Sequence, residues 1–145
     1  MKLSPKQRET VYAMFEGHCA YCGQVLPLKG WHADHVKAVC REWWNRTSKT
    51  THSVVDGKMI ATVTKIPVGM LHPHHDVIEN IFPACRACNI DKSVSDLEDW
   101  RKQLERRPQV LRDNYSAYRH AERFGLVAQV NTKVIFYFEQ FVSTK

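Results

Sequence analysis

Apolar residues near the start of the chain recur at helical spacing. Residues 4–7 (SPKQ) place a serine, a proline and a glutamine where a helix N-cap, its first position and a capping box require them. Val11, Met14 and Phe15 then form one apolar stripe, and Gly17 is suited to a helix C-terminus. The pattern predicts a short N-terminal helix that ends beside the first cysteine pair.

The central part of the chain has strand-like patterns. Residues 30–39 (GWHADHVKAV) alternate in the way a strand does, around an unusually polar centre. Further on, Asp56 and Gly57 separate two apolar runs in SVVDGKMIA, which predicts a β-hairpin. Pro67, Gly69 and Pro73 favour loop structure after that hairpin.

The second half of the chain reads as mostly helical. A short helix is expected over residues 85–92, and a second capping box at residues 95–98 (SDLE) opens a charged helix through about Arg107. Pro108 is expected to restart a helix that runs to about Phe124. The apolar runs LVAQV and VIFYF, with Asn131 and Thr132 between them, predict a closing β-hairpin.

Composition limits the class of protein. The 145 residues suffice for one domain, with 43% hydrophobic and 25% charged residues, as in ordinary globular proteins. The net charge of +6 favours a polyanionic partner, most simply nucleic acid. No apolar run approaches the ~20 residues of a membrane span. The start MKLSPKQRET lacks a signal-peptide apolar region, so we expect a cytoplasmic protein.

Four of the five cysteines form two C-x-x-C pairs, while Cys40 stands alone. The pairs are Cys19 with Cys22 and Cys85 with Cys88. Disulfides are unexpected in a reducing compartment, and two such pairs are typical of a structural zinc site with four thiolate ligands. The alternative is buried free cysteines or a redox pair. A zinc ion here would close a loop of 62 residues between Cys22 and Cys85 and so stabilise a small fold.

Each cysteine pair leads into polar residues that suit phosphodiester hydrolysis. The first leads towards Asp34 and His35, and the second is followed directly by Asn89. A carboxylate and a carboxamide oxygen suit Mg²⁺, which stabilises charge on a phosphate. An imidazole with a pKa near ~6.5 accepts a proton from water at neutral pH. Neighbours in a strand point to opposite sides, so Asp34 and His35 can take different roles.

These residues carry a resemblance to a known family. The DH pair, followed by ENIFPACRACNIDK at residues 79–92, resembles the signature of the HNH (ββα-metal) endonucleases. The opening SPKQRETVYAMFEGHCAYCG is also similar to that of phage-type HNH proteins. The strong match covers residues 18–92, and residues 95–145 would add C-terminal helices and a small hairpin to a single domain, 1–145.

The resemblance implies a role for each matching position. Asp34 and Asn89 correspond to ligands of a catalytic divalent ion, Mg²⁺ or Mn²⁺, and His35 corresponds to the general base. Asn80 corresponds to the middle asparagine, which steadies the loop that bears the base. The structural zinc set corresponds to Cys19, Cys22, Cys85 and Cys88.

The chain departs from the family pattern in two places. The third signature letter is Asn89 rather than histidine, a variant that the family also uses. The 44 residues between His35 and Asn80 exceed the compact motif, which an inserted hairpin explains. Asn80 alone also fits a turn residue that bonds its own backbone.

Other polar residues are secondary candidates. Lys92, Arg86 and His32 are predicted to contact DNA phosphate, with a structural histidine as the alternative for His32. A solvated loop is the favoured interpretation of the HPHHD segment that contains three histidines, and a solvated helix face is the favoured one for residues 101–107. Trp43 and Trp44 suit base stacking or packing.

The sequence thus predicts an α+β fold, built on a ββα-metal core stapled by zinc, with an N-terminal helix, an inserted hairpin, C-terminal helices and a closing hairpin. The predicted activity is metal-dependent DNA hydrolysis in a bacterial host cell. A phage-type member of the family, either a monomer or a homodimer, is expected. The alternative is a zinc-stabilised DNA-binding module without activity. A toxin or anti-defence factor acting on a protein has no positive feature in its favour.

Overall fold

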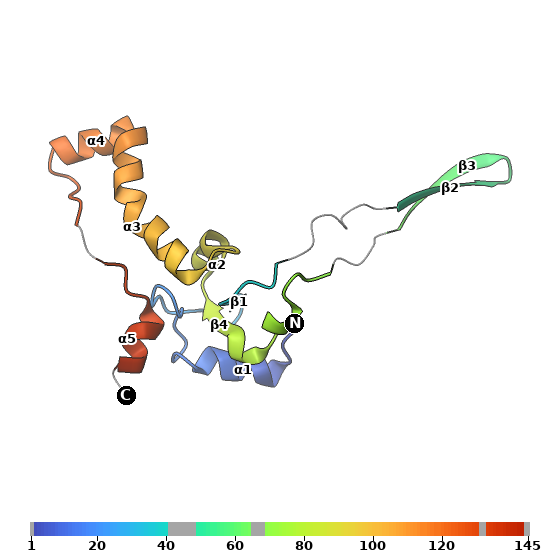
Figure 1. The fold of residues 1–145 in the computed structure, drawn as a ribbon, viewed down its shortest axis with the longest axis horizontal. Helices are drawn as coiled ribbons and strands as arrows, with labels where there is room; N and C mark the ends of the chain where they lie inside the picture. Colours follow the sequence, from blue (N-terminus) through green and yellow to red (C-terminus); the bar gives the residue numbers. More distant parts are fainter. Residues whose placement is uncertain (1, 41–48, 65–68, 131–132, 144–145) are drawn as a thin grey trace.

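The structure is a computed structural model that describes residues 2–40, 49–64, 69–130 and 133–143 (Figure 1). Helices and small antiparallel sheets make it an α+β protein, as the sequence predicts. The α-helices are α1 (Pro5–Ala13), α2 (Arg86–Lys92), α3 (Leu97–Asn114), α4 (Ser116–Arg123) and α5 (Tyr137–Ser143). The strands are β1 (His32–His35), β2 (Lys49–Val55), β3 (Lys58–Thr64) and β4 (Ile81–Ala84), and the short 3-10 turns are η2 (Pro73–His75) and η3 (Ile78–Asn80). Trp43 and Trp44 lie outside the described residues.

The N-terminal helix α1 begins as its sequence predicts. Ser4 caps it, and the backbone N–H of Gln7 donates to the Ser4 hydroxyl while the Gln7 side chain accepts from the Ser4 N–H. The reciprocal pair satisfies two donors that a helix start would otherwise leave open. Val11 of this helix is fully buried, and Gly17 follows with a φ of 74°, a conformation that glycine adopts without strain.

Strands β1 and β4 pair in antiparallel fashion although 45 residues lie between them in the chain. His32 is opposite Ala84 and His35 is opposite Ile81. Helix α2 follows β4 at once and packs on β1, so a two-stranded ribbon and one helix form a continuous unit. This unit contains Asp34 and His35 in β1 and Asn89 in α2, the residues that the sequence predicts to form the catalytic site.

The predicted hairpin at Asp56 and Gly57 is present as β2 and β3. Seven residue pairs form its ladder, from Lys49 opposite Thr64 to Val55 opposite Lys58. Asp56 has a φ of 50° and Gly57 a φ of 72°, and two positive values in succession fit the tight turns that join two-stranded hairpins. Residues 50–62 are all exposed, and the hairpin extends away from the other elements (Figure 1).

The prediction of a helix restart at Pro108 is wrong, because α3 runs through this proline to Asn114. Proline removes one backbone donor, but the remaining hydrogen bonds of a long helix persist on both sides of it. The chain instead breaks at Tyr115, whose backbone is extended. The Arg112 guanidinium bonds the Glu122 carboxylate at 2.6 Å across this corner and holds α4 against α3.

The predicted C-terminal hairpin is also wrong. The described parts of residues 126–136 form no strand, and the second apolar run leads into helix α5. The backbone N–H groups of Tyr137 and Phe138 donate to the carbonyls of Tyr21 and Ala20, at 2.9 and 2.8 Å. These contacts with the first cysteine knuckle therefore satisfy two backbone donors at the start of α5. Strand propensity reflects only the local sequence, so it could not predict this long-range stabilisation of a helix.

The core lies between the first cysteine knuckle, β4, α3 and the segment before α5. Trp100 is its largest member at 2% exposure, stacked on Phe136 with ring centroids 5.1 Å apart and edge-on to Tyr21 at 5.2 Å. Other buried apolar residues include Val11, Phe15, Leu26, Trp31 and Ile81. In the described part of the chain, no helix combines the length and the apolar character needed to cross a bilayer.

Replacing Trp100 with alanine should lower the free energy of unfolding by about 3–5 kcal/mol, because it removes a buried indole from a packed aromatic cluster. Phe124→Ala is the matched control: Phe124 is 79% exposed, so its loss should change stability by no more than about 0.5 kcal/mol. Chemical denaturation of the purified protein measures both values. Equal effects of the two variants would contradict this assignment of the core.

Candidate metal centre and adjoining polar site

The four paired cysteines come together in space. The thiols of Cys19, Cys22, Cys85 and Cys88 all lie within 4.8 Å of one another. The sulfurs of Cys22 and Cys85 are 3.9 Å apart. Four sulfurs placed tetrahedrally at about 2.3 Å from a zinc ion would be about 3.8 Å from one another, so the two separations are similar. The cluster predicted from the sequence is thereby confirmed as a group that could hold a metal ion such as zinc. Cys40 is not a member of it.

Backbone groups support the sulfurs. The N–H of Cys85 donates to the Cys19 sulfur at 3.3 Å, and the N–H of Cys88 donates to the Cys85 sulfur at 3.4 Å, which also caps α2. A hydrogen bond from the Cys88 thiol lowers the pKa of Cys19 to about 4, and nearby backbone N–H groups add to this effect. The thiolate, the form that binds metal, is therefore favoured at Cys19, whereas burial raises the pKa of Cys22 and the hydrogen bond with Cys19 raises the pKa of Cys88.

Asp34 lies on the buried side of β1, and its Oδ2 atom accepts one hydrogen bond and forms one ion pair. The Tyr21 hydroxyl donates to it at 2.5 Å, and the Lys92 ammonium lies 3.1 Å from it. Asp34 is 7% exposed and Lys92 is fully buried, so the two charges neutralise each other inside the protein. Burial, followed by the charge of Asp34, raises the pKa of Tyr21 well above its usual range, so the phenol remains a donor.

The second carboxylate oxygen of Asp34 faces solvent. Within the described residues, every buried side-chain nitrogen or oxygen has a hydrogen-bond partner. Both contacts of Asp34 end on Oδ2, so Oδ1 has no protein partner there and is open to water. The half-buried carboxamide of Asn89 likewise has no side-chain hydrogen bond among these residues.

Helix α2 places Asn89 one turn from Lys92, on the same side of the helix. The Lys92 ammonium bonds the Asp34 carboxylate and also donates to the His35 carbonyl at 2.8 Å. Asn89 therefore lies on the same side of α2 as the lysine that contacts the end of β1. The two oxygen donors predicted as cation ligands lie on neighbouring elements of one compact unit.

His35 lies on the opposite side of β1 from Asp34 and is partly exposed. Its Nε2 atom is 2.8 Å from the Oδ1 atom of Asp76, and the two side chains are 20% and 19% exposed. A carboxylate accepts, so this contact favours the tautomer with a proton on Nε2 and a lone pair on Nδ1. Sequence reasoning missed Asp76, because 40 residues separate it from His35 and no local pattern links them.

Asn80 ties the segment after β1 to the segment before β4. Its carboxamide accepts from the Lys37 N–H at 2.9 Å and donates to the carbonyls of Lys37 and His75, both at 2.8 Å. The Asn80 carbonyl also accepts from the N–H of Val36. These contacts fix the backbone that follows His35, which is the geometry that a loop-steadying asparagine needs.

The residues predicted to contact DNA have different surroundings. Arg86 is exposed in the first turn of α2, and His32 is half-buried at the start of β1. Lys92 is fully buried, so its ammonium binds Asp34 and His35 and is not presented to a phosphate in this conformation.

The HPHHD segment forms η2, where the imidazoles pack on one another with centroids 4.3–5.9 Å apart. Of the described residues, only the four cysteines above bring three or more potential ligand atoms this close together. The histidine segment therefore offers no second metal centre of that kind.

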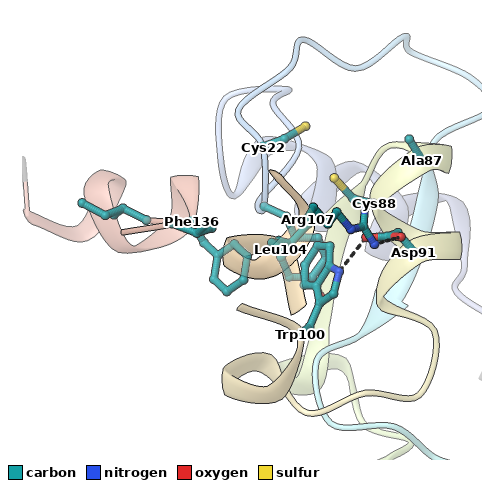
Figure 2. Close-up of a pocket in the computed structure, with 11 residues that line it drawn as sticks. Cys22, Ala87, Cys88, Asp91, Trp100, Leu104, Arg107 and Phe136 are labelled. Atoms are coloured by element: carbon teal, nitrogen blue, oxygen red, sulfur yellow. Dashed lines mark hydrogen bonds and ion pairs between the residues drawn. The ribbon is translucent and has the colours of Figure 1, made fainter. Parts of the chain in front are cut away.

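A largely apolar pocket of about 430 Å³ lies beside the cysteine cluster. Figure 2 shows Trp100 and Arg107 both directed at Asp91 near Cys22 and Cys88. The Trp100 indole N–H donates to Asp91 at 2.7 Å, and the Arg107 guanidinium bonds the same carboxylate at 2.5 Å. These contacts tie α3 to α2 next to the sulfurs.

Comparison of the chain with protein-family models, with curated proteins and with solved structures finds no match.

The protein purified in the presence of zinc should contain one zinc ion per chain. Cys85→Ser should lose this ion, because the Cys85 thiol is both a predicted ligand and the N-cap of α2. Cys40→Ser is the matched control and should keep the full zinc content. Elemental analysis of the purified variants measures this ratio. Equal zinc content in the two serine variants would contradict the ligand assignment.

Proposed function

We propose that this protein is a metal-dependent DNA endonuclease of the HNH (ββα-metal) type. The supporting observation is that the Lys92 ammonium bonds both the Asp34 carboxylate and the His35 carbonyl. That contact ties the end of α2, one turn after Asn89, to the strand end that carries the predicted base. The proposed general base and the two proposed oxygen ligands belong to one ribbon-and-helix unit.

His35 is the proposed general base. Its Nε2–H donates to the Asp76 carboxylate, which leaves the Nδ1 lone pair to accept a proton from the attacking water. The backbone that follows the imidazole is held by Lys92, which bonds the His35 carbonyl, and by the contacts of Asn80. A fixed ring orientation reduces the entropy lost when substrate and water are positioned.

Asp34 Oδ1 and the Asn89 carboxamide oxygen are the proposed ligands of a divalent cation. Both are hard oxygen donors without a protein partner among the described residues, which suits Mg²⁺ or Mn²⁺. When bound, such a cation would stabilise negative charge on the phosphate and on the departing 3′ oxygen. The products implied by the family resemblance carry 5′-phosphate and 3′-hydroxyl ends.

DNA is the proposed substrate. The chain has a net charge of +6, and Arg86 lies exposed on the helix that follows the cysteine knuckle. His32, two residues before Asp34 on the same strand, could add a contact to the phosphate backbone. A reducing bacterial cytoplasm would keep the four thiols available for zinc.

A zinc-stabilised DNA-binding module without catalytic activity is the second candidate. The buried ion pair between Asp34 and Lys92 favours it, because that pair gives the aspartate a structural purpose without any cation. This alternative assigns no role to the His35–Asp76 pair, nor to the Asp34 Oδ1 atom and the Asn89 carboxamide, which have no protein partner in the described part of the chain.

His35→Ala should lower the rate of plasmid nicking in Mg²⁺ or Mn²⁺ by about 100- to 10,000-fold, because it removes the base but none of the zinc ligands. His52→Ala is the matched control, since His52 is exposed on β2, and it should nick at the wild-type rate. Gel assays of supercoiled plasmid, with zinc content measured in parallel, give both results.

The endonuclease proposal fails if His35→Ala nicks as fast as the wild type. It also fails if the wild-type protein retards DNA on a gel without nicking it in either cation. The second outcome would support the binding module.

A further inference from the structure

A hydroxyl and an ammonium from different segments contact one oxygen of Asp34. The first is the Tyr21 hydroxyl, from the loop between Cys19 and Cys22, and the second is the Lys92 ammonium, from the end of the helix that contains Cys88. Each half of the cysteine cluster therefore carries a side chain that reaches the same carboxylate. Neither contact is explained by zinc binding alone.

Tyr21 is held firmly in place. It is 2% exposed, its ring lies edge-on to Trp100 and Phe136, and its carbonyl accepts from the Tyr137 N–H at 2.9 Å. The hydroxyl therefore has a fixed position relative to the thiols on either side of it. A fixed donor restricts the rotation of the carboxylate that it bonds.

Lys92 fixes the same oxygen from the other side. Its fully buried ammonium spans Asp34 Oδ2 and the His35 carbonyl, so it links the side chain of one residue to the backbone of the next. With both contacts on Oδ2, Oδ1 is left as the carboxylate oxygen without a protein partner among the described residues.

We propose that Tyr21 is a positioning residue for the cation site: together with Lys92 it holds Asp34 Oδ2 and thereby presents Oδ1 as the single carboxylate ligand oxygen. This inference rests on the proposed cation site of Asp34 and Asn89. It adds that the loop of the first cysteine knuckle sets the orientation of a cation ligand. Hydrogen bonds to ligating carboxylates commonly matter in this way, and losing one typically costs 10–100-fold in metal affinity or activity.

The test is Mn²⁺ binding to the zinc-loaded protein, measured by calorimetry with three variants. Tyr21→Phe keeps the buried ring and removes only the hydroxyl, so we expect Mn²⁺ to bind at least tenfold more weakly while zinc content stays at one per chain. Tyr12→Phe is the matched control: it also removes a tyrosine hydroxyl hydrogen bond, here to the Leu26 carbonyl at 2.9 Å, and should bind Mn²⁺ as the wild type does. Asp34→Asn should abolish binding.

The outcomes separate this inference from the proposed function. If the wild type binds Mn²⁺, Asp34→Asn does not, and Tyr21→Phe matches the wild type, the positioning role of Tyr21 is refuted while the cation site stands. If the wild type and Asp34→Asn bind equally or not at all, the cation site itself is refuted. If Tyr21→Phe and Tyr12→Phe weaken binding equally, the effect is general loosening, and the positioning role is again refuted.

Discussion

The approach of two C-x-x-C segments, 62 residues apart in the chain, is the constraint on which the rest of the structure depends. A small chain has a limited core, so a metal ion that closes such a long loop removes much of the entropy of the unfolded state. Three other elements are built on this junction. β4 leads into the second knuckle, α2 begins at it, and α5 docks on the backbone of the first.

The junction also explains how charged groups are buried next to the core. Lys92 and Asp34 would each be costly to bury alone, but their opposite charges form an ion pair. Asp34 also accepts a hydrogen bond from Tyr21, and Lys92 donates one to the His35 carbonyl. Among the described residues, the Asp34 Oδ1 atom and the Asn89 carboxamide have no protein partner, and both supply oxygens of the kind that hard cations bind. Asp34 therefore both stabilises the fold and is a proposed cation ligand.

Sequence reasoning predicted what local chemistry determines. The capping box of α1, the Asp56–Gly57 turn and the cysteine cluster are all observed. It was wrong where distant contacts decide, as in the C-terminal segment that becomes α5 on the first knuckle. Tyr21 and Asp76 were missed for the same reason, because their partners lie far along the chain. The roles of His35 and Asn89 stay predictions that the geometry accommodates.

The exposed hairpin has a consequence for how such a protein can diversify. Its ladder is self-contained, and residues 50–62 contribute nothing to the buried interior. Substitutions there are free of the packing demands that govern β1, β4 and α2. Natural variation could therefore remodel this protrusion, as an exchangeable cassette, while the scaffold beneath it stays unaltered.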